Sequence, residues 1–210
     1  MALKVQYTDM KSVLLLLTGW LALTTSVFGQ GTISFVNTST TLIRTNDLQG
    51  HVGNMGGTTG ACKIELLVAP TGTTIGPSPG NLGAWSIIAT ATNSPALAGR
   101  FFGGTVTNTL TTAGGPMAVM VRAWLADQGH PSFDSTQFGT GTSGQWYAGQ
   151  TSILQLAGSG NPNPPATPAA AIFGAGLLQG IVLSITIPEP STVVLGLLGI
   201  CALALFRRRK

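Results

Sequence analysis

Thr32-Ile33-Ser34-Phe35-Val36 alternates polar and apolar residues with a period of two, and this stretch indicates the fold class. Such alternation predicts a β-strand with one buried face, and we expect this strand to lie at the outer side of a sheet. Ile64-Glu65-Leu66-Leu67-Val68 is a second stretch of strand composition, which follows the glycine-rich residues 53–60 and precedes Pro70. Both stretches favour a β-protein.

Strand composition recurs along the middle of the chain at fairly even spacing, with glycine and proline between the segments. The further segments are residues 85–92, 99–110, 117–125, 151–156 and 177–187. No stretch between them has the pattern of a long, capped amphipathic helix. We therefore predict an all-β domain over residues 30–187, a single jelly-roll-like β-sandwich whose first strand pairs near the last. Residues 158–168 are rich in Gly, Asn and Pro and are expected to form an exposed loop.

The start of the chain has the pattern of a secretory signal. An apolar stretch, residues 13–23, follows Lys11 and precedes Val27-Phe28-Gly29, which suits a signal peptidase. This predicts a signal peptide over residues 1–29 and a mature chain that begins at Gln30. Asp9 is unfavourable before the apolar stretch, so Met10 is a candidate initiator. An uncleaved membrane anchor is the alternative.

The end of the chain combines an uncharged apolar run with a cluster of cations. Residues 191–206 would form a helix of roughly 24 Å, somewhat short for a bilayer core of about 30 Å. Four cations follow and favour the cytoplasmic side, so the preceding domain should face away from the cytoplasm; they are Arg207, Arg208, Arg209 and Lys210. Pro188 and Pro190 set the outer boundary of the helix. A buried core helix is the alternative.

Pro188-Glu189-Pro190, the short membrane helix and the basic end together resemble the PEP-CTERM sorting domain of bacterial secreted proteins. The resemblance implies that a membrane-embedded exosortase recognises residues 188–210 and cleaves near the triplet, often in organisms that make exopolysaccharide. It also implies an inner-membrane anchor before processing and a cell-surface or extracellular location afterwards. In the middle of the chain, Val121-Arg122-Ala123-Trp124 and Ser132-Phe133, together with residues 149–153, resemble ectodomains of such proteins from Verrucomicrobia-like bacteria.

The formal net charge of +4 arises outside the predicted domain. Residues 30–187 carry only four cations and four acids. This is a far smaller share than in an ordinary soluble domain, where charged residues make up roughly 25% of the chain. This neutral balance argues against nucleic acid as a partner. The charged residues are Arg44, Lys63, Arg100 and Arg122 against Asp47, Glu65, Asp127 and Asp134.

Residues suited to catalysis or metal binding are sparse. Asp127, His130 and Asp134 fall in one predicted loop and could offer ligands to a metal, but such loops are usually only solvated. No two acids form an obvious glycosidase pair. We therefore expect no cofactor, no metal and no catalysis.

Aromatic residues support one binding alternative. Trp146 and Tyr147 lie in a glycine-rich stretch, residues 139–149, which we expect to be a loop that could contact carbohydrate. Trp124 and Cys62 are expected in the core. Asn37-Thr38-Ser39 forms a glycosylation sequon that we interpret as chance in a bacterium.

The sequence thus predicts an exported, non-catalytic protein of the cell envelope or extracellular matrix. Its expected partners are signal peptidase, an exosortase-type enzyme and, before processing, the membrane. A carbohydrate-binding module for exopolysaccharide is the main alternative, and a metal-dependent enzyme around Asp127 and His130 is the third.

Overall fold

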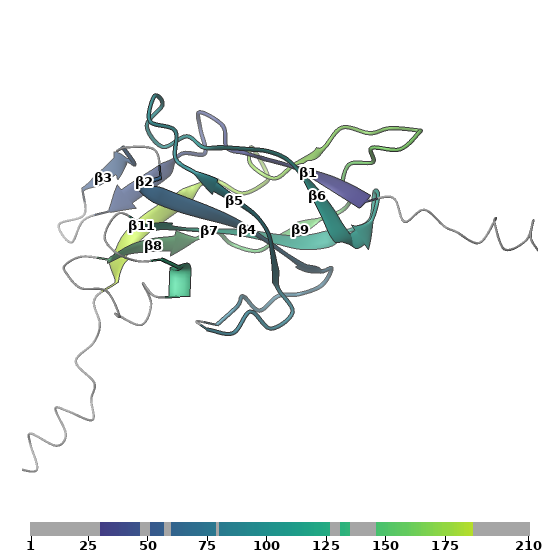
Figure 1. The fold of residues 1–210 in the computed structure, drawn as a ribbon, viewed down its shortest axis with the longest axis horizontal. Coiled ribbons are helices and arrows are strands. Elements are labelled where there is room, and N and C mark those ends of the chain that lie inside the picture. The colour runs from purple at the N-terminus through teal and green to yellow at the C-terminus, as the bar shows by residue number, and fades with distance from the viewer. Residues whose placement is uncertain are drawn as a thin grey trace, which may run out of the picture.

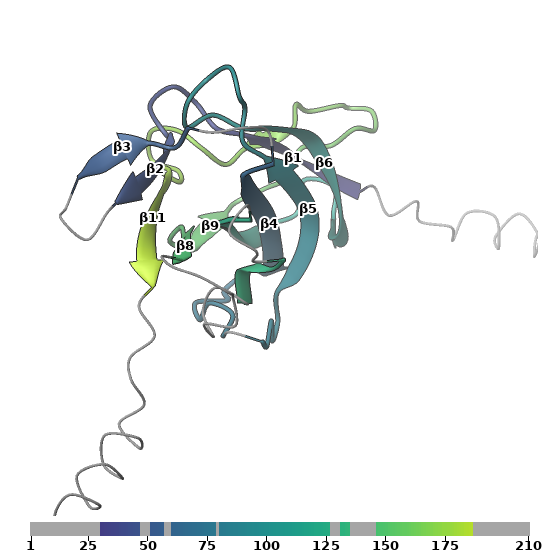
Figure 2. The same cartoon turned by 60° about the vertical axis from the view of Figure 1, so that its left-hand side comes forward.

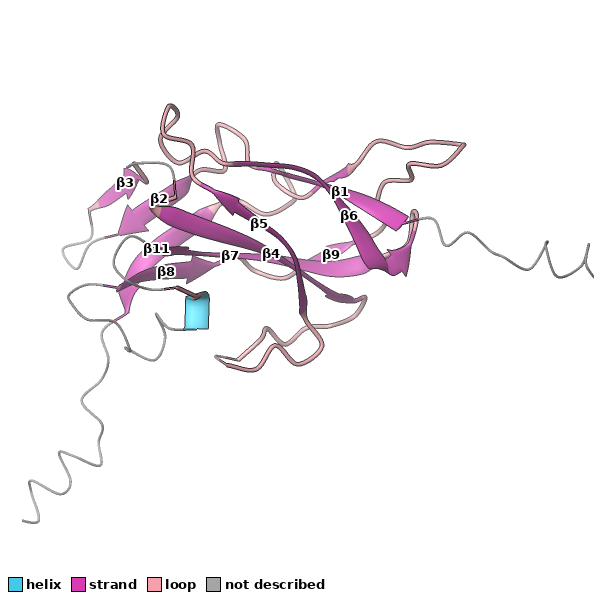
Figure 3. Ribbon diagram, in the orientation of Figure 1, coloured by secondary structure: helices cyan, strands magenta, loops and turns pink. Residues whose placement is uncertain are grey.

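The computed structural model describes residues 30–46, 51–56, 60–78, 80–126, 131–134 and 146–186 (Figure 1). Within these ranges the chain forms strands and connecting loops, with a short helical turn that includes Phe133 and Asp134 (Figure 3). The all-β prediction is confirmed. The predicted signal peptide, residues 188–190 and the predicted membrane helix lie outside the described residues. In the part of the chain that is described, no helix has the length and apolar character needed to cross a membrane.

The strands form two sheets. The small sheet has the order β10-β1-β6, and the large sheet has the order β3-β2-β11-β8-β7-β4-β5, with β9 pairing separately with β7. Figure 2 shows β2, β3 and β11 gathered at one end of the large sheet and β4 and β5 at the other. The bounds are β1 Gln30–Val36, β2 Ile43–Asn46, β3 Val52–Asn54, β4 Cys62–Pro70, β5 Ser86–Thr92, β6 Phe102–Thr112, β7 Met117–Leu125, β8 Trp146–Gln150, β9 Leu154–Leu156, β10 Ala170–Ala171 and β11 Ile181–Thr186.

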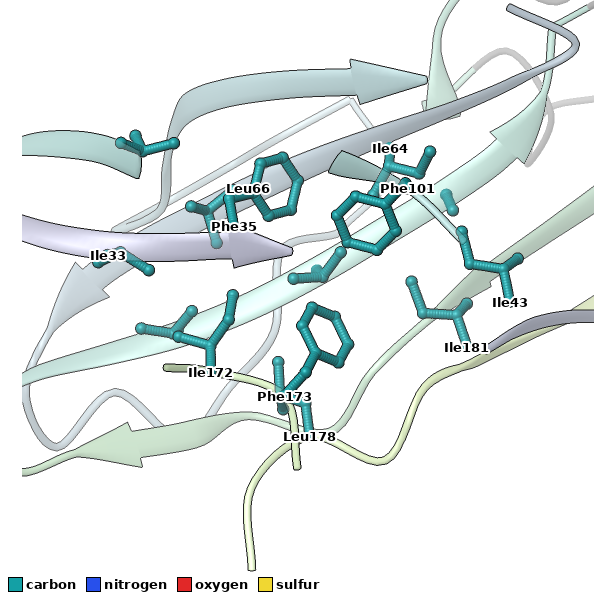
Figure 4. Packing of buried hydrophobic residues seen from close by; sticks show 14 of the residues in the cluster. Ile33, Phe35, Ile43, Ile64, Leu66, Phe101, Ile172, Phe173, Leu178 and Ile181 are labelled. Atoms are coloured by element: carbon teal, nitrogen blue, oxygen red, sulfur yellow. The ribbon is translucent and has the colours of Figure 1, made fainter. Parts of the chain in front are cut away.

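The main core contains side chains from both sheets. Ile33 and Phe35 of β1 and Ile64 of β4 are fully buried in one cluster, as the period of two in each strand requires. Figure 4 shows side chains of this cluster converging between the strands. Phe101 is at its centre, with its ring centroid 5.0 Å from that of Phe35 and 5.7 Å from that of Phe173, both in edge-to-face geometry. This arrangement is consistent with a β-sandwich.

Strand β7 is buried on both faces. Val119 and Val121 face the main core, while Met120 belongs to a second cluster and Trp124 to a third on the opposite face. The second cluster also contains Trp85, so the segment before β5 covers part of that face. A strand covered on both sides is expected to be almost continuously apolar. This explains the composition of Met117–Leu125, in which Arg122 is the exception.

The predicted position of the first strand is wrong. Strand β1 lies between β10 and β6, not at the outer side of its sheet, and it pairs with β10 instead of with the last strand. The last strand, β11, lies between β2 and β8 in the large sheet. The alternation of β1 specifies a buried face correctly, but alternation carries no information about which strand lies on either side.

Four strands lie where no strand was predicted, namely β2, β3, β8 and β10. Three of them have no more than four residues, too few to show a period. Strand β8 was predicted as loop because of its glycine content. Gly149 is required there because an added Cβ would collide with the backbone carbonyl of Val182 in β11. That glycine permits close strand packing and does not mark a turn.

Candidate functional site on the outer face of the large sheet

The large sheet presents a polar row on the side turned away from the main core, which we call the outer face. In β4, Ile64 points into the main core, so Lys63 and Glu65 lie on the outer face. In β7, Trp124 is opposite Lys63 and Arg122 is opposite Glu65. The neighbouring strand β5 adds two hydroxyls, because Thr92 pairs with Lys63 and Thr90 pairs with Glu65.

A buried ion pair occupies the middle of this face. The Arg122 Nε donates a hydrogen bond to Glu65 Oε2 at 2.7 Å, and Arg122 Nη1 donates to Asp134 Oδ1 at 3.4 Å. The side chains of Arg122 and Glu65 are only 4% and 12% exposed, whereas that of Asp134 is 30% exposed. The Arg122 guanidinium also lies over the Phe133 ring, 4.8 Å from its centroid. Arg122 thus connects β4 and β7 and holds the Phe133–Asp134 turn against the sheet.

Two hollows flank this ion pair. The smaller, of about 230 Å³, adjoins Arg122, and the larger, of about 400 Å³, adjoins Glu65. The smaller is lined by Pro77, Ser78, Arg122, Phe133, Asp134, Gly149 and Gln150. The larger is lined by Lys63, Glu65, Thr90, Ala91, Thr92, Phe102, Trp124 and Pro131. Both combine polar groups with an aromatic ring.

The predicted carbohydrate contacts do not lie in a loop. Trp146 and Tyr147 begin strand β8, where their backbones pair with Thr186 and Ile185 of β11. The Tyr147 side chain is half-buried and packs against the main core. The side chain of Trp146 lies outside the described part of the structure. Carbohydrate contact at this pair stays a prediction, without the support of an exposed loop.

The predicted metal ligands are only partly described. Asp127 and His130 lie outside the described residues, and Asp134 contacts Arg122. Among the described residues, no three His, Cys, Asp or Glu side chains come together as a metal-binding group. The two core predictions are confirmed, because Trp124 is 2% exposed and Cys62 is fully buried.

The sequon asparagine has a structural role. Asn37 is 1% exposed, and its Nδ2 donates to the carbonyls of Thr41 and Gly99 at 2.9 and 2.8 Å. Its Oδ1 accepts hydrogen bonds from the Phe101 amide at 3.0 Å and from Arg100 Nε at 3.3 Å. The side-chain amide is therefore engaged inside the fold, where a glycan could not be attached.

Neither the exposed position of Phe102 nor the pairing of Glu65 with Arg122 was predicted from the sequence. The sequence nevertheless contains a pattern that points to each of these two features. Phe101 and Phe102 are adjacent, so in a strand one of the two rings must face away from the core. Glu65 and Arg122 are the lone ionisable residues within two largely apolar runs, and lone charges in such runs usually find each other.

Comparison with known proteins identifies the end of the chain. Residues 186–210 match the family model of the PEP-CTERM protein-sorting motif. No curated protein and no solved structure matches the chain. The matched segment begins at Thr186, the residue at which β11 ends. The triplet, the apolar run and the basic cluster that suggested the resemblance all fall within it. Residues 186–210 of this chain are therefore a PEP-CTERM protein-sorting motif.

Proposed function

We propose that this chain is a non-catalytic protein of the cell envelope or extracellular matrix, which an exosortase-type enzyme sorts and cleaves near Pro188-Glu189-Pro190. The PEP-CTERM motif implies export and exosortase processing. The single observation that carries the proposal is the match over residues 186–210. The proposal adds a signal peptide over residues 1–29, removed by signal peptidase, a membrane helix over residues 191–206, and a jelly-roll-like sandwich as the exported domain.

The position of β11 supports direct attachment of the domain to its sorting signal. Ile181 and Leu183 of β11 are buried in the main core, and the strand pairs on both sides, with β2 and β8. Pro188 follows Thr186 by two residues, which can span at most about 7 Å. The triplet is thus tied closely to an inner strand of the large sheet, with no long linker. Before cleavage, this arrangement keeps the folded domain near the membrane surface.

The chemistry of the outer face supports a non-catalytic role. The Glu65 carboxylate is held by Arg122 at 2.7 Å, so it is engaged as a structural ion-pair partner. A glycosidase instead needs two carboxyl groups facing each other across a substrate. Asp134, the other described acid of this face, contacts the same guanidinium.

The sorting proposal can be tested by replacing Pro188-Glu189-Pro190 with Ala-Gln-Ala in a host that has an exosortase. Membrane insertion should be unchanged, because the apolar run and the terminal cations supply it. Processing should fail, and the full-length chain should accumulate in the inner membrane, as followed by cell fractionation and immunoblotting.

A matched control replaces Pro162 and Pro168, two exposed prolines of the loop that precedes β10, with alanine. This variant should be processed like the unaltered chain. If the Ala-Gln-Ala variant were trimmed and released at the normal rate, the triplet would not be a recognition element and the proposal would fail.

A further inference from the structure

An exposed aromatic ring forms one side of the larger hollow on the outer face. Phe102, at the start of β6, is 55% exposed, although its neighbour Phe101 is fully buried in the main core. The hollow also presents the exposed side chains of Thr90 and Thr92. Keeping a large apolar ring in water has a free-energy cost, and ligand sites commonly combine aromatic side chains with a few convergent polar groups.

The backbone that carries this ring is firmly held. The Phe101 amide donates to the buried Asn37 side chain at 3.0 Å, and the Phe101 ring packs between Phe35 and Phe173. The Arg100 guanidinium lies over the Phe102 ring, 5.2 Å from its centroid, and its Nε contacts Asn37. A ring placed in advance loses little conformational entropy when a ligand stacks on it.

Among the described residues at the hollow, the charges that have no ion-pair partner are positive. Glu65 lines the hollow, but its carboxylate is paired with Arg122. Lys63 is exposed on the same surface, and the ion pairs found among the described residues all involve Arg122. Arg100 adds a second cation beside the ring. A ligand with negative charge is therefore favoured.

We propose that this hollow binds an anionic polysaccharide, with Phe102 stacking on a sugar ring and Lys63 pairing with a carboxylate. A sugar ring presents an apolar C–H face to an aromatic ring, and its hydroxyls can bond to Thr90 and Thr92. An acidic polypeptide would use Lys63 but would not use the ring and the hydroxyls together. This site is separate from Trp146 and Tyr147. Its ligand binding is independent of sorting, although export would bring the site to such a ligand.

The test uses the full chain, purified in a polyoxyethylene detergent that contains no sugar. Retention is measured by affinity gel electrophoresis through polygalacturonate, through neutral dextran and through polyglutamate. We expect retention by polygalacturonate that weakens as salt is raised, and weaker retention by the other two polymers. Phe102→Ala should lower the affinity for polygalacturonate by about tenfold or more, as loss of a central aromatic contact usually does. Lys63→Gln should lower it by about twofold to fivefold and reduce its salt dependence.

Two control variants match these changes. Leu110→Ala removes a side chain that is 52% exposed on the same strand, β6, and Arg44→Gln removes an exposed cation on β2. Neither should change retention, and unchanged thermal unfolding should show that all four variants fold. The proposal is overturned if polygalacturonate does not retain the protein, or if the controls lose as much affinity as the hollow variants. Equal retention by dextran would exclude an anionic ligand, and equal retention by polyglutamate would show attraction by charge alone.

Discussion

Replacing Glu65 with alanine should destabilise the domain strongly, because it leaves the Arg122 guanidinium buried without its main partner. The Arg122 side chain is 4% exposed, and its 2.7 Å bond to Glu65 is much shorter than its 3.4 Å contact with Asp134. Removing one partner of a buried pair costs about 3–5 kcal/mol. We expect about 3 kcal/mol, at the lower end of that range, because Asp134 and the Phe133 ring still face the guanidinium.

The assay is urea unfolding of residues 30–187, followed by tryptophan fluorescence, since Trp85 and Trp124 are both buried. With a slope of about 1.5–3 kcal/mol per molar urea, the midpoint should fall by roughly 1–2 M. Lys63→Ala is the matched control on the same face of β4. Lys63 is exposed, so this change should shift the free energy of unfolding by about 0.5 kcal/mol or less.

The double variant Glu65→Leu with Arg122→Met distinguishes an unpaired charge from lost packing. It removes both charges and should be within about 1 kcal/mol of the unaltered domain, because apolar replacement of a buried pair is often neutral or stabilising. The reasoning is refuted if Glu65→Ala costs less than about 1 kcal/mol, or if the double variant is less stable than the single one.

Two further predictions concern the start of the mature chain and strand β8. Material exported from a native-like host should begin at or near Gln30, and N-terminal mass spectrometry that found an intact Met1 or Met10 would contradict this. Tyr147→Ala should lower the free energy of unfolding by about 2–4 kcal/mol because the ring packs against the main core, whereas Tyr147→Phe should cost less. If urea unfolding showed a negligible change in the free energy of unfolding for the alanine variant, Tyr147 would not contribute to the core.

Local patterns in the sequence predicted the class of the fold and several buried positions. The alternation in residues 32–36 identified a buried face, and Ile33 and Phe35 are fully buried there. The apolar composition of residues 117–125 predicted a strand that the structure confirms as β7. These signals depend on neighbours within a few residues, so they can be read directly. Strand β8 was missed because its glycine content is typical of loops, while the requirement for Gly149 arises from contact with β11.

The sequence by itself determined the sorting motif of this protein, because its triplet, apolar run and cations are contiguous and act through their order along the chain. It also determined the all-β class, which short-range periodicity specifies. Only the tertiary structure decided which strands pair, that β11 is an inner strand, and that Glu65 meets Arg122, a residue 57 positions away. It alone placed Phe102 of the small sheet beside Lys63 of the large one. Such contacts depend on long-range registers, which local alternation leaves unspecified.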